Sequence, residues 1–154
     1  AVAFAKQGIA TMRVGYRKPG DIERCTLDVS AAADLAWRSG ARRFVTMGHS
    51  FGGAIAVRVA VSVPAVAGVV TLATQSAGCE VAGGLEGRPL LLFHGDRDEL
   101  LPLGVSETVL AIAGSGELVE LPGTGHLMLE AADELRSRLV EWVPAVLGAH
   151  GSAR

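Results

Sequence analysis

The chain has 154 residues, a length typical of one domain, and 49% of them are hydrophobic while 19% are charged. Its mean hydropathy of +0.37 excludes an intrinsically disordered chain. The net charge is −2 and the basic residues form no stripe beyond Arg42-Arg43, which argues against nucleic-acid binding. Because no apolar stretch approaches the roughly 20 residues of a membrane-spanning helix and no secretory signal opens the chain, we expect a soluble, cytoplasmic protein without a membrane partner.

The chain has two cysteines, Cys25 and Cys79, with no CxxC spacing and no cluster of Cys and His. This pattern favours neither a disulfide framework nor a structural zinc site. We therefore expect both thiols to be reduced and structural, and we expect no metal ligands.

Short apolar runs alternate with Ala- and Leu-rich segments, which is typical of a parallel sheet covered by helices on both faces. The runs predict strands at residues 9–16, 43–47, 66–74, 89–94 and 117–121. Helices are predicted at 27–38, 51–63, 106–112 and 127–146, the last one kinked or ended near Pro144. We expect a single α/β domain over residues 1–147 with about five mostly parallel strands, followed by a flexible tail at 148–154.

The predicted strand at 43–47 runs into Gly48-His49-Ser50-Phe51-Gly52, a GxSxG sequence followed by an apolar helix. In a nucleophile elbow the serine occupies a tight turn, so the residues two before and two after it must be small. Ser50 would stand at the carboxyl end of the sheet, and the Phe51 N–H at the start of the helix would face a developing oxyanion. A bare GxSxG is expected about 0.15 times by chance, so a structural turn is the alternative interpretation.

Two later segments, 94–98 (His-Gly-Asp-Arg-Asp) and 122–126 (Pro-Gly-Thr-Gly-His), each follow a predicted strand. Together with the GxSxG segment they resemble the α/β-hydrolase fold family, whose triad runs Ser, Asp or Glu, then His along the chain. The resemblance implies that Ser50 is the nucleophile, Asp98 the acid and His126 the base, with no cofactor. Asp96 is the alternative acid, and a lone solvated loop histidine is the alternative interpretation of His126.

A serine hydroxyl is a weak nucleophile until an imidazole accepts its proton, and that imidazole needs a carboxylate to fix its tautomer. The carboxyl ends of parallel strands meet at one edge of the sheet, so we expect all three groups to converge there. Of the other polar residues, His94 is predicted to be structural, whereas His49 and Gln75 are candidates for contacting substrate.

The sequence departs from the family pattern in two places. The interval 75–88 is too short for the helical cap that relatives commonly insert there, so we expect an open cleft. The central strand before 9–16, with its His-Gly loop that supplies a second oxyanion N–H, has no counterpart, and residues 1–7 resemble the end of the helix after it. We expect a fold truncated at its N-terminus, and three outcomes stay open: a fragment of a longer product, direct pairing of the flanking strands, or a strand from another chain.

The leading hypothesis is a serine hydrolase that cleaves small esters, with a small-molecule ester or acyl compound as its partner. The same triad would also serve a thioesterase, an acyltransferase or a peptidase, and nothing in the sequence separates these. The alternative from another class is a non-catalytic or truncated domain that acts only in binding. An incomplete sheet would leave apolar edges unpaired, which predicts self-association.

Overall fold

The computed structural model describes residues 2–148 and contains one sheet of four parallel strands in the order β1-β2-β3-β4. The strands are β1 (Phe44–His49), β2 (Val66–Leu72), β3 (Leu90–Gly95) and β4 (Glu117–Leu121). Parallel neighbours need crossover connections, and these contain α3 (Phe51–Ser62), the short 3₁₀ helix η1 (Ala82–Leu85) and α4 (Gly104–Ala113). The helices outside the sheet region are α1 (Val2–Ala5), α2 (Ile22–Arg38) and α5 (Ala132–Gly148).

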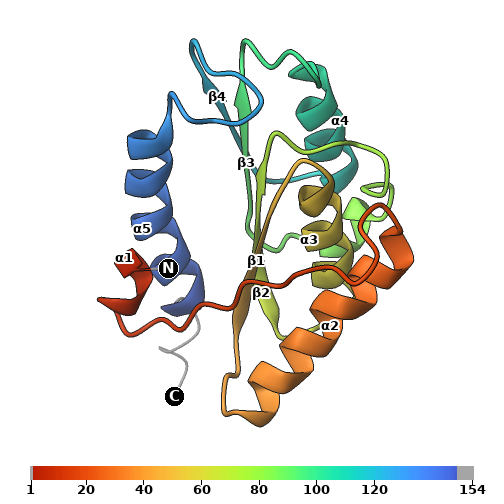
Figure 1. The fold of residues 1–154 in the computed structure, drawn as a ribbon, viewed down its shortest axis with the longest axis vertical. Helices are drawn as coiled ribbons and strands as arrows, with labels where there is room; N and C mark the ends of the chain where they lie inside the picture. The colour runs from red at the N-terminus through yellow and green to blue at the C-terminus, as the bar shows by residue number, and fades with distance from the viewer. Residues whose placement is uncertain (1, 149–154) are drawn as a thin grey trace.

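Helices cover both faces of the sheet. In Figure 1, α5 and α1 lie on one side of the strands, and α3, α4 and α2 lie on the other. Every residue of β3 is buried, which explains the uninterrupted apolar run that predicted it. Two hydrophobic clusters result, one around Ile55 and Leu92 on the α3 side and one around Phe93 and Leu121 on the α5 side.

The predicted first strand, residues 9–16, is wrong: this segment forms no strand, so the sheet has four strands and not five. It runs as an extended connection from α1 toward α2, across the sheet in the view of Figure 1. Most of its residues are exposed, as at Met12 (54% exposed). A strand is stable only when a neighbour pairs with its backbone, and none of the described residues does so here.

The edge of β1 away from β2 has no strand beside it within residues 2–148. The N–H groups of Phe44 and Ser50 donate to carbonyls of the β2 side, so the even-numbered residues face β2. The backbone N–H and C=O groups of Val45, Met47 and His49 therefore point toward the open edge. In this region the side chain of Met47 is also 43% exposed.

Three helices begin at different residues from those predicted, and the smallest difference is at α4, which starts at Gly104 and not at residue 106. Helix α2 starts at Ile22 and not at residue 27, because the Asp21 carboxylate caps it by accepting the Arg24 N–H (3.1 Å). Helix α5 starts at Ala132 and not at residue 127. The loop before it contains Met128 at a φ of +57°, a conformation that an α-helix cannot hold.

Pro144 does not end α5, and the backbone carbonyl that the proline leaves without a helical donor is hydrogen-bonded elsewhere. The helix continues through Gly148, which the prediction had assigned to the tail, and the rest of that predicted tail, 149–154, lies outside the described residues. A proline in a helix leaves the carbonyl four residues earlier without a donor. Here that carbonyl, Val140 O, accepts from Gln7 Nε2 (3.4 Å), which also ties the N-terminal segment to α5.

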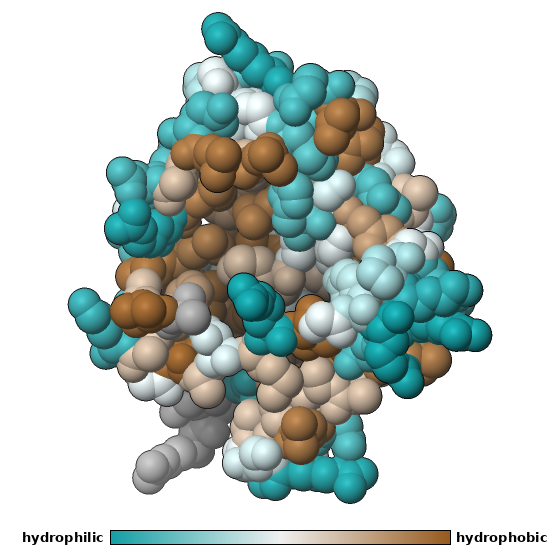
Figure 2. All heavy atoms as spheres, in the orientation of Figure 1, coloured by the Kyte–Doolittle hydropathy of each residue, from teal (hydrophilic) through white to brown (hydrophobic). Residues whose placement is uncertain are grey.

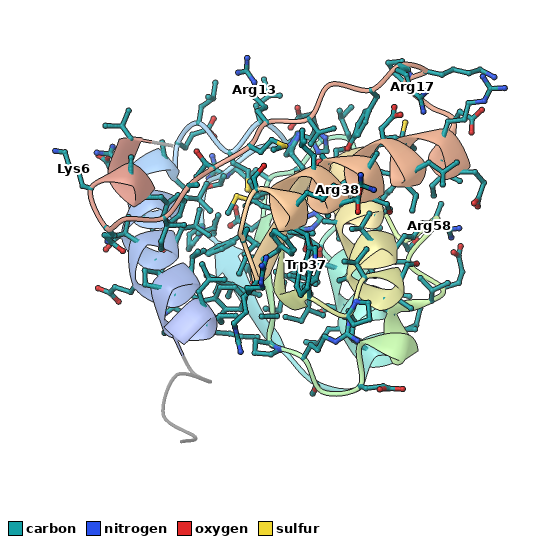
Figure 3. All side chains as sticks on the ribbon, turned by 90° about the horizontal axis from the view of Figure 1, so that it is seen from below. Lys6, Arg13, Arg17, Trp37, Arg38 and Arg58 are labelled. Carbon is teal, nitrogen blue, oxygen red and sulfur yellow. The ribbon has the colours of Figure 1, made fainter. Side chains whose placement is uncertain are left out.

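Arginines on the face formed by α2 and α3 are paired with carboxylates. Figure 3 labels Arg17, Arg38 and Arg58 around these helices. Arg58 reaches Glu23 at 2.6 Å and so joins α3 to α2, while Arg17 reaches Asp28 at 2.6 Å and fixes the segment that enters α2. No helix within the described part of the chain combines the length and the apolar character needed to cross a bilayer.

Candidate active site

Ser50 lies in a sharp turn between β1 and α3, with φ +52° and ψ −118°. Such a conformation is rare for residues other than glycine and persists only where the surroundings enforce it. The Ser50 N–H donates to Leu72 O at 2.8 Å, which fixes the turn to the end of β2. Phe51 is the first residue of α3, so its N–H has no acceptor within the helix and lies beside the serine.

The close contacts around this turn fall on Gly48 and Gly53. A Cβ at Gly48 would overlap the Gly52 carbonyl, and one at Gly53 would overlap the buried Thr74 side chain. A Cβ at Gly52 would meet only the Tyr16 hydroxyl at 3.4 Å. The steric demand predicted at Gly48 is therefore observed, whereas the one predicted at Gly52 is stronger at Gly53, which the pentapeptide pattern does not include.

The loops after β3 and β4 are joined by backbone contacts. The Arg97 N–H donates to Thr124 O (3.1 Å), and the Gly123 N–H donates to the Asp96 carboxylate (2.6 Å). Gly95 is required at the crossing point, because a Cβ there would overlap the Thr124 carbonyl. These contacts hold the two loops in one register, so the side chains that follow them meet in a fixed geometry.

His126 and Asp98, from these two loops, form a direct hydrogen bond. His126 Nδ1 lies 2.8 Å from Asp98 Oδ2, and the side chains are 6% and 1% exposed. Burial alone raises the pKa of the Asp98 carboxyl, but hydrogen bonds from the Leu101 N–H, the His126 ring and the Leu100 N–H hold that pKa below its usual value. Asp98 is therefore ionised at neutral pH, so Nδ1 of His126 carries the proton and Nε2 is an acceptor.

The two other acidic residues of this turn have different contacts. Asp96 is exposed, and its carboxylate accepts only the Gly123 N–H, so the alternative acid does not contact His126. Glu99 accepts the backbone N–H of His126 at 3.3 Å and helps to hold the loop. No motif predicted this contact of Glu99, because it depends on how the two loops cross.

His49 contacts the loop of His126. Its Nε2 donates to the His126 carbonyl at 2.8 Å, and the two rings lie 4.8 Å apart between centroids. His49 directly precedes Ser50, so this contact brings the histidine loop against the serine turn. Within residues 2–148 no hydrogen bond joins Ser50 Oγ to His126 Nε2. Gln75 donates to Ala77 O (2.7 Å) within its own loop, and no contact places it at the serine.

His94 is the penultimate residue of β3 and is fully buried beside Asp98. Its Nε2 lies 2.9 Å from Leu101 O and 3.3 Å from Asp98 Oδ2, and its Nδ1 lies 2.7 Å from the hydroxyl of Ser106. The sequence predicted a structural role for this histidine. The contact with Asp98 and the contact with Ser106, a fully buried residue in the first turn of α4, were not predicted.

No protein-family model matches the sequence, and no curated protein matches it. Solved structures do. An α/β serine hydrolase homologue from Coxiella burnetii aligns with a TM-score of 0.73 at 23% identity, over 90% of this chain and 71% of its own. A protein of unknown function from Agrobacterium tumefaciens, described as a candidate α/β hydrolase, aligns with a TM-score of 0.77 at 19% identity, over 97% of this chain and 75% of its own.

A third structure, the dienelactone hydrolase from Anabaena variabilis, aligns with a TM-score of 0.71 at 24% identity, over 80% of this chain and 60% of its own. The chain adopts the α/β-hydrolase fold. Its four strands and their helices match part of that fold, and the neighbours contain further structure that has no counterpart in the described residues. The connection between β2 and β3 contains η1 and no larger helical insertion.

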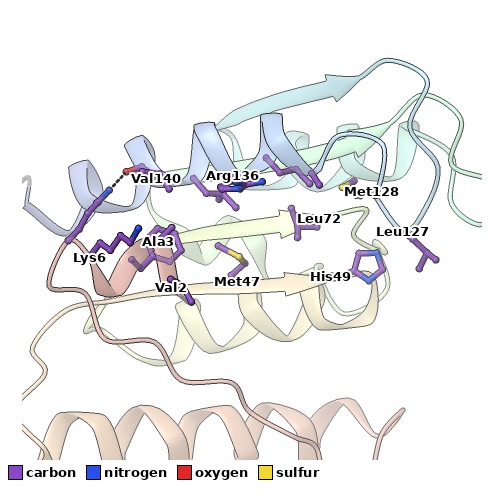
Figure 4. A pocket seen from close by; sticks show the side chains of 15 residues that line it. Val2, Ala3, Lys6, Met47, His49, Leu72, Leu127, Met128, Arg136 and Val140 are labelled. Atoms are coloured by element: carbon purple, nitrogen blue, oxygen red, sulfur yellow. Dashed lines mark hydrogen bonds between the residues drawn. The ribbon is translucent and has the colours of Figure 1, made fainter.

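Beside this α/β-hydrolase sheet, an apolar groove of about 1120 Å³ runs between the open edge of β1 and α5. Figure 2 shows the hollow, with hydrophobic residues around it, and Figure 4 shows His49 and Lys6 toward its two ends. The groove is lined by α1 and the residues just after it, and by apolar side chains from β1, β2, α5 and the loop before α5: Met47, Leu72, Leu127, Met128, Leu135 and Leu139. It therefore reaches the elbow region through His49.

Proposed function

We propose that the chain is a serine hydrolase that cleaves small esters, with Ser50 as nucleophile, His126 as base and Asp98 as the group that orients His126. The observation that carries this proposal is the buried contact of 2.8 Å between His126 Nδ1 and Asp98 Oδ2, next to the strained turn of Ser50. Buried, oriented imidazole–carboxylate pairs are typical of sites that activate a nucleophile.

The reaction takes two steps. His126 Nε2 accepts the Ser50 hydroxyl proton while Oγ bonds to the ester carbonyl carbon, and the Phe51 N–H binds the oxyanion. Collapse of the tetrahedral intermediate breaks the bond to the leaving alkoxide, which takes the proton from His126. Water then attacks the acyl-enzyme with His126 as base, releasing the acid and restoring the Ser50 hydroxyl. No cofactor takes part in either step.

Two features support the convergence of these groups. The His49 ring packs against the His126 ring, and His49 is adjacent to Ser50 in the chain. In hydrolases without substrate the hydrogen bond between serine and histidine is often long and tightens when substrate binds.

The short β2–β3 connection leaves the site open, which favours small, accessible substrates. The neighbour from Anabaena variabilis is a dienelactone hydrolase, and a lactone is a cyclic ester.

The test compares the chain with Ser50→Ala on a short-chain aryl ester and measures labelling of Ser50 by a phosphonate probe. We expect stoichiometric labelling of the unmodified chain and loss of nearly all activity in the variant. Ser62→Ala is the matched control, because Ser62 is an exposed serine whose hydroxyl bonds only Arg58 O. A rate within tenfold of the unmodified chain in Ser50→Ala, or no labelling of the folded chain, would reject the hydrolase.

The bond that is cleaved is the second part of the test. The same triad chemistry applies to esters, thioesters and amides, so rates on a matched panel of the three decide between an esterase, a thioesterase and a peptidase. Transfer to an added alcohol in place of water identifies an acyltransferase. We expect the ester to be turned over fastest.

A further inference from the structure

A second imidazole, His94, lies behind the proposed acid and takes no part in the reaction described above. It is 0% exposed, as is Ser106, its neighbour in α4. A buried imidazole loses its contacts with water, so its nitrogen atoms need partners within the protein. The partners that His94 has define which of its nitrogens carries a proton.

The contacts fix one tautomer of His94. Nε2 lies 2.9 Å from the carbonyl oxygen of Leu101, which can only accept, so Nε2 carries a hydrogen. Asp98 Oδ2 lies 3.3 Å from the same nitrogen, beside the hydrogen bond to Leu101. In the neutral ring Nδ1 is then an acceptor, and the Ser106 hydroxyl donates to it at 2.7 Å. Ser106 thereby holds His94 in the form that donates to Leu101 O.

Asp98 accepts hydrogen bonds on both oxygens. Oδ1 accepts the N–H groups of Leu100 (2.9 Å) and Leu101 (2.8 Å), which fix that oxygen to its own turn. Oδ2 binds His126 at 2.8 Å and lies 3.3 Å from His94 Nε2, whose hydrogen bond goes to Leu101 O. His94 therefore fixes, from the side of β3, the turn whose Leu101 N–H holds the carboxylate toward His126.

We infer that His94, held by Ser106, is a positioning residue for the Asp98–His126 pair. This inference rests on the proposed function and extends it to two residues outside the triad. The chain of contacts runs from the Ser106 hydroxyl to His94, from His94 to Leu101 O, from the Leu101 N–H to Asp98 Oδ1, and from Asp98 Oδ2 to His126 Nδ1. It restricts Oδ2 to the position in which it orients His126.

Three substitutions test the Nε2–H donor of His94: one removes it, one removes the hydroxyl that holds its tautomer, and one replaces it with another N–H donor. His94→Phe keeps a planar ring and removes both nitrogens, and Ser106→Ala removes only the hydroxyl that selects the tautomer. His94→Gln keeps an amide N–H at about the reach of Nε2. Ser62→Ala is the matched control for the serine exchange. Each protein is titrated with the phosphonate probe, so that rates are expressed per functional site and not per folded chain.

The first measurement is the pair kcat and KM on the aryl ester. We expect kcat per site to fall about tenfold in His94→Phe and by less in Ser106→Ala, since the hydrogen bond that fixes the turn of Leu101 and Asp98 is lost or weakened. KM should stay within about twofold, because His94 does not contact substrate. His94→Gln should recover most of the rate.

The second measurement is independent of activity and covers the case in which His94→Phe does not fold. The proton on His126 Nδ1 gives a downfield NMR signal when it is hydrogen-bonded to a carboxylate. In Ser106→Ala this signal should shift and exchange faster with water, whereas Ser62→Ala should leave it in place. If the unmodified chain is not labelled at Ser50, the proposed function fails, and the NMR signal alone decides the positioning role.

Two results would overturn the inference. One is an unmoved Nδ1–H signal in Ser106→Ala together with an unchanged kcat per site. The other is a loss in His94→Gln as large as that in His94→Phe, which would assign the effect to packing of the ring and not to its N–H donor.

Discussion

Replacing Asp98 by Asn tests the proposed site most directly, because the exchange keeps the size of the side chain and removes its charge. The amide has one oxygen and one NH₂ group. If its oxygen keeps the N–H groups of Leu100 and Leu101, the NH₂ faces the Nδ1–H of His126, and a donor meets a donor. If the amide is turned over, the NH₂ faces the two backbone donors instead. In neither orientation can the amide accept from all the N–H donors that the carboxylate accepts from.

The cost of this exchange falls mainly on catalysis. With the NH₂ toward His126, the imidazole relieves the clash by moving its proton to Nε2, and Nε2 can then no longer accept the serine proton. In a Ser–His–Asp triad such a loss of tautomer lowers kcat by about 10⁴, or about 5.5 kcal/mol of activation free energy. The folded state should lose about 1–3 kcal/mol, since a buried polar group is left without a partner.

The assay is aryl-ester hydrolysis at neutral pH, normalised by active-site titration, with urea unfolding to measure the change in stability. Asp96→Asn is the matched control, because Asp96 lies in the same turn, is exposed, and contacts the Gly123 N–H and not His126. We expect the control to keep its rate within about threefold. A kcat for Asp98→Asn within tenfold of the unmodified chain, or a larger loss in Asp96→Asn, would refute the assignment of the acid.

Three further predictions follow from packing, ionisation and the open sheet edge. Gly48→Ala should cost more than about 3 kcal/mol in urea unfolding, since its Cβ overlaps backbone. Gly104→Ala, whose Cβ would meet only the Glu107 carboxylate at an ordinary contact distance of 3.7 Å, should be nearly neutral. Burial raises the pKa of the Cys79 thiol from 9.0 to about 11. The unfolded thiol therefore ionises first as pH rises, and about 2–3 kcal/mol of stability should be lost between these values; a Cys79→Ala variant that loses as much would contradict this. The unpaired edge of β1 should make the chain self-associate in sedimentation velocity, and Met47→Lys should reduce that association; a purely monomeric unmodified chain would count against it.

The sequence predicted the parts of the fold that depend on local pattern. The runs that became β2 and β3 are apolar on both faces, as buried parallel strands are. The segment 9–16 has a similar composition and failed as a strand. Strand formation needs a partner backbone, and composition does not tell whether a partner is present.

In the candidate site, too, some features could be predicted from local sequence patterns and others depended on tertiary contacts. Ser50, Asp98 and His126 were identified because each follows a strand within a recognisable pattern. The contacts that hold them, such as Gly95 against Thr124 and Glu99 on the His126 N–H, involve residues that lie outside any motif. Of the substrate candidates, His49 lies at the site and Gln75 bonds within its own loop.

The positions of β1 to β4 along the chain and the small residue at Gly48 were readable from the sequence alone, because they arise from periodicity and from steric rules that act over a few residues. The triad candidates came from the resemblance of three motifs to a known fold family. Tertiary structure decided which histidine touches Asp98 from behind, how the loops after β3 and β4 cross, and that one edge of β1 is open. Those features join residues far apart in the chain, and their distances exist only after the sheet has assembled.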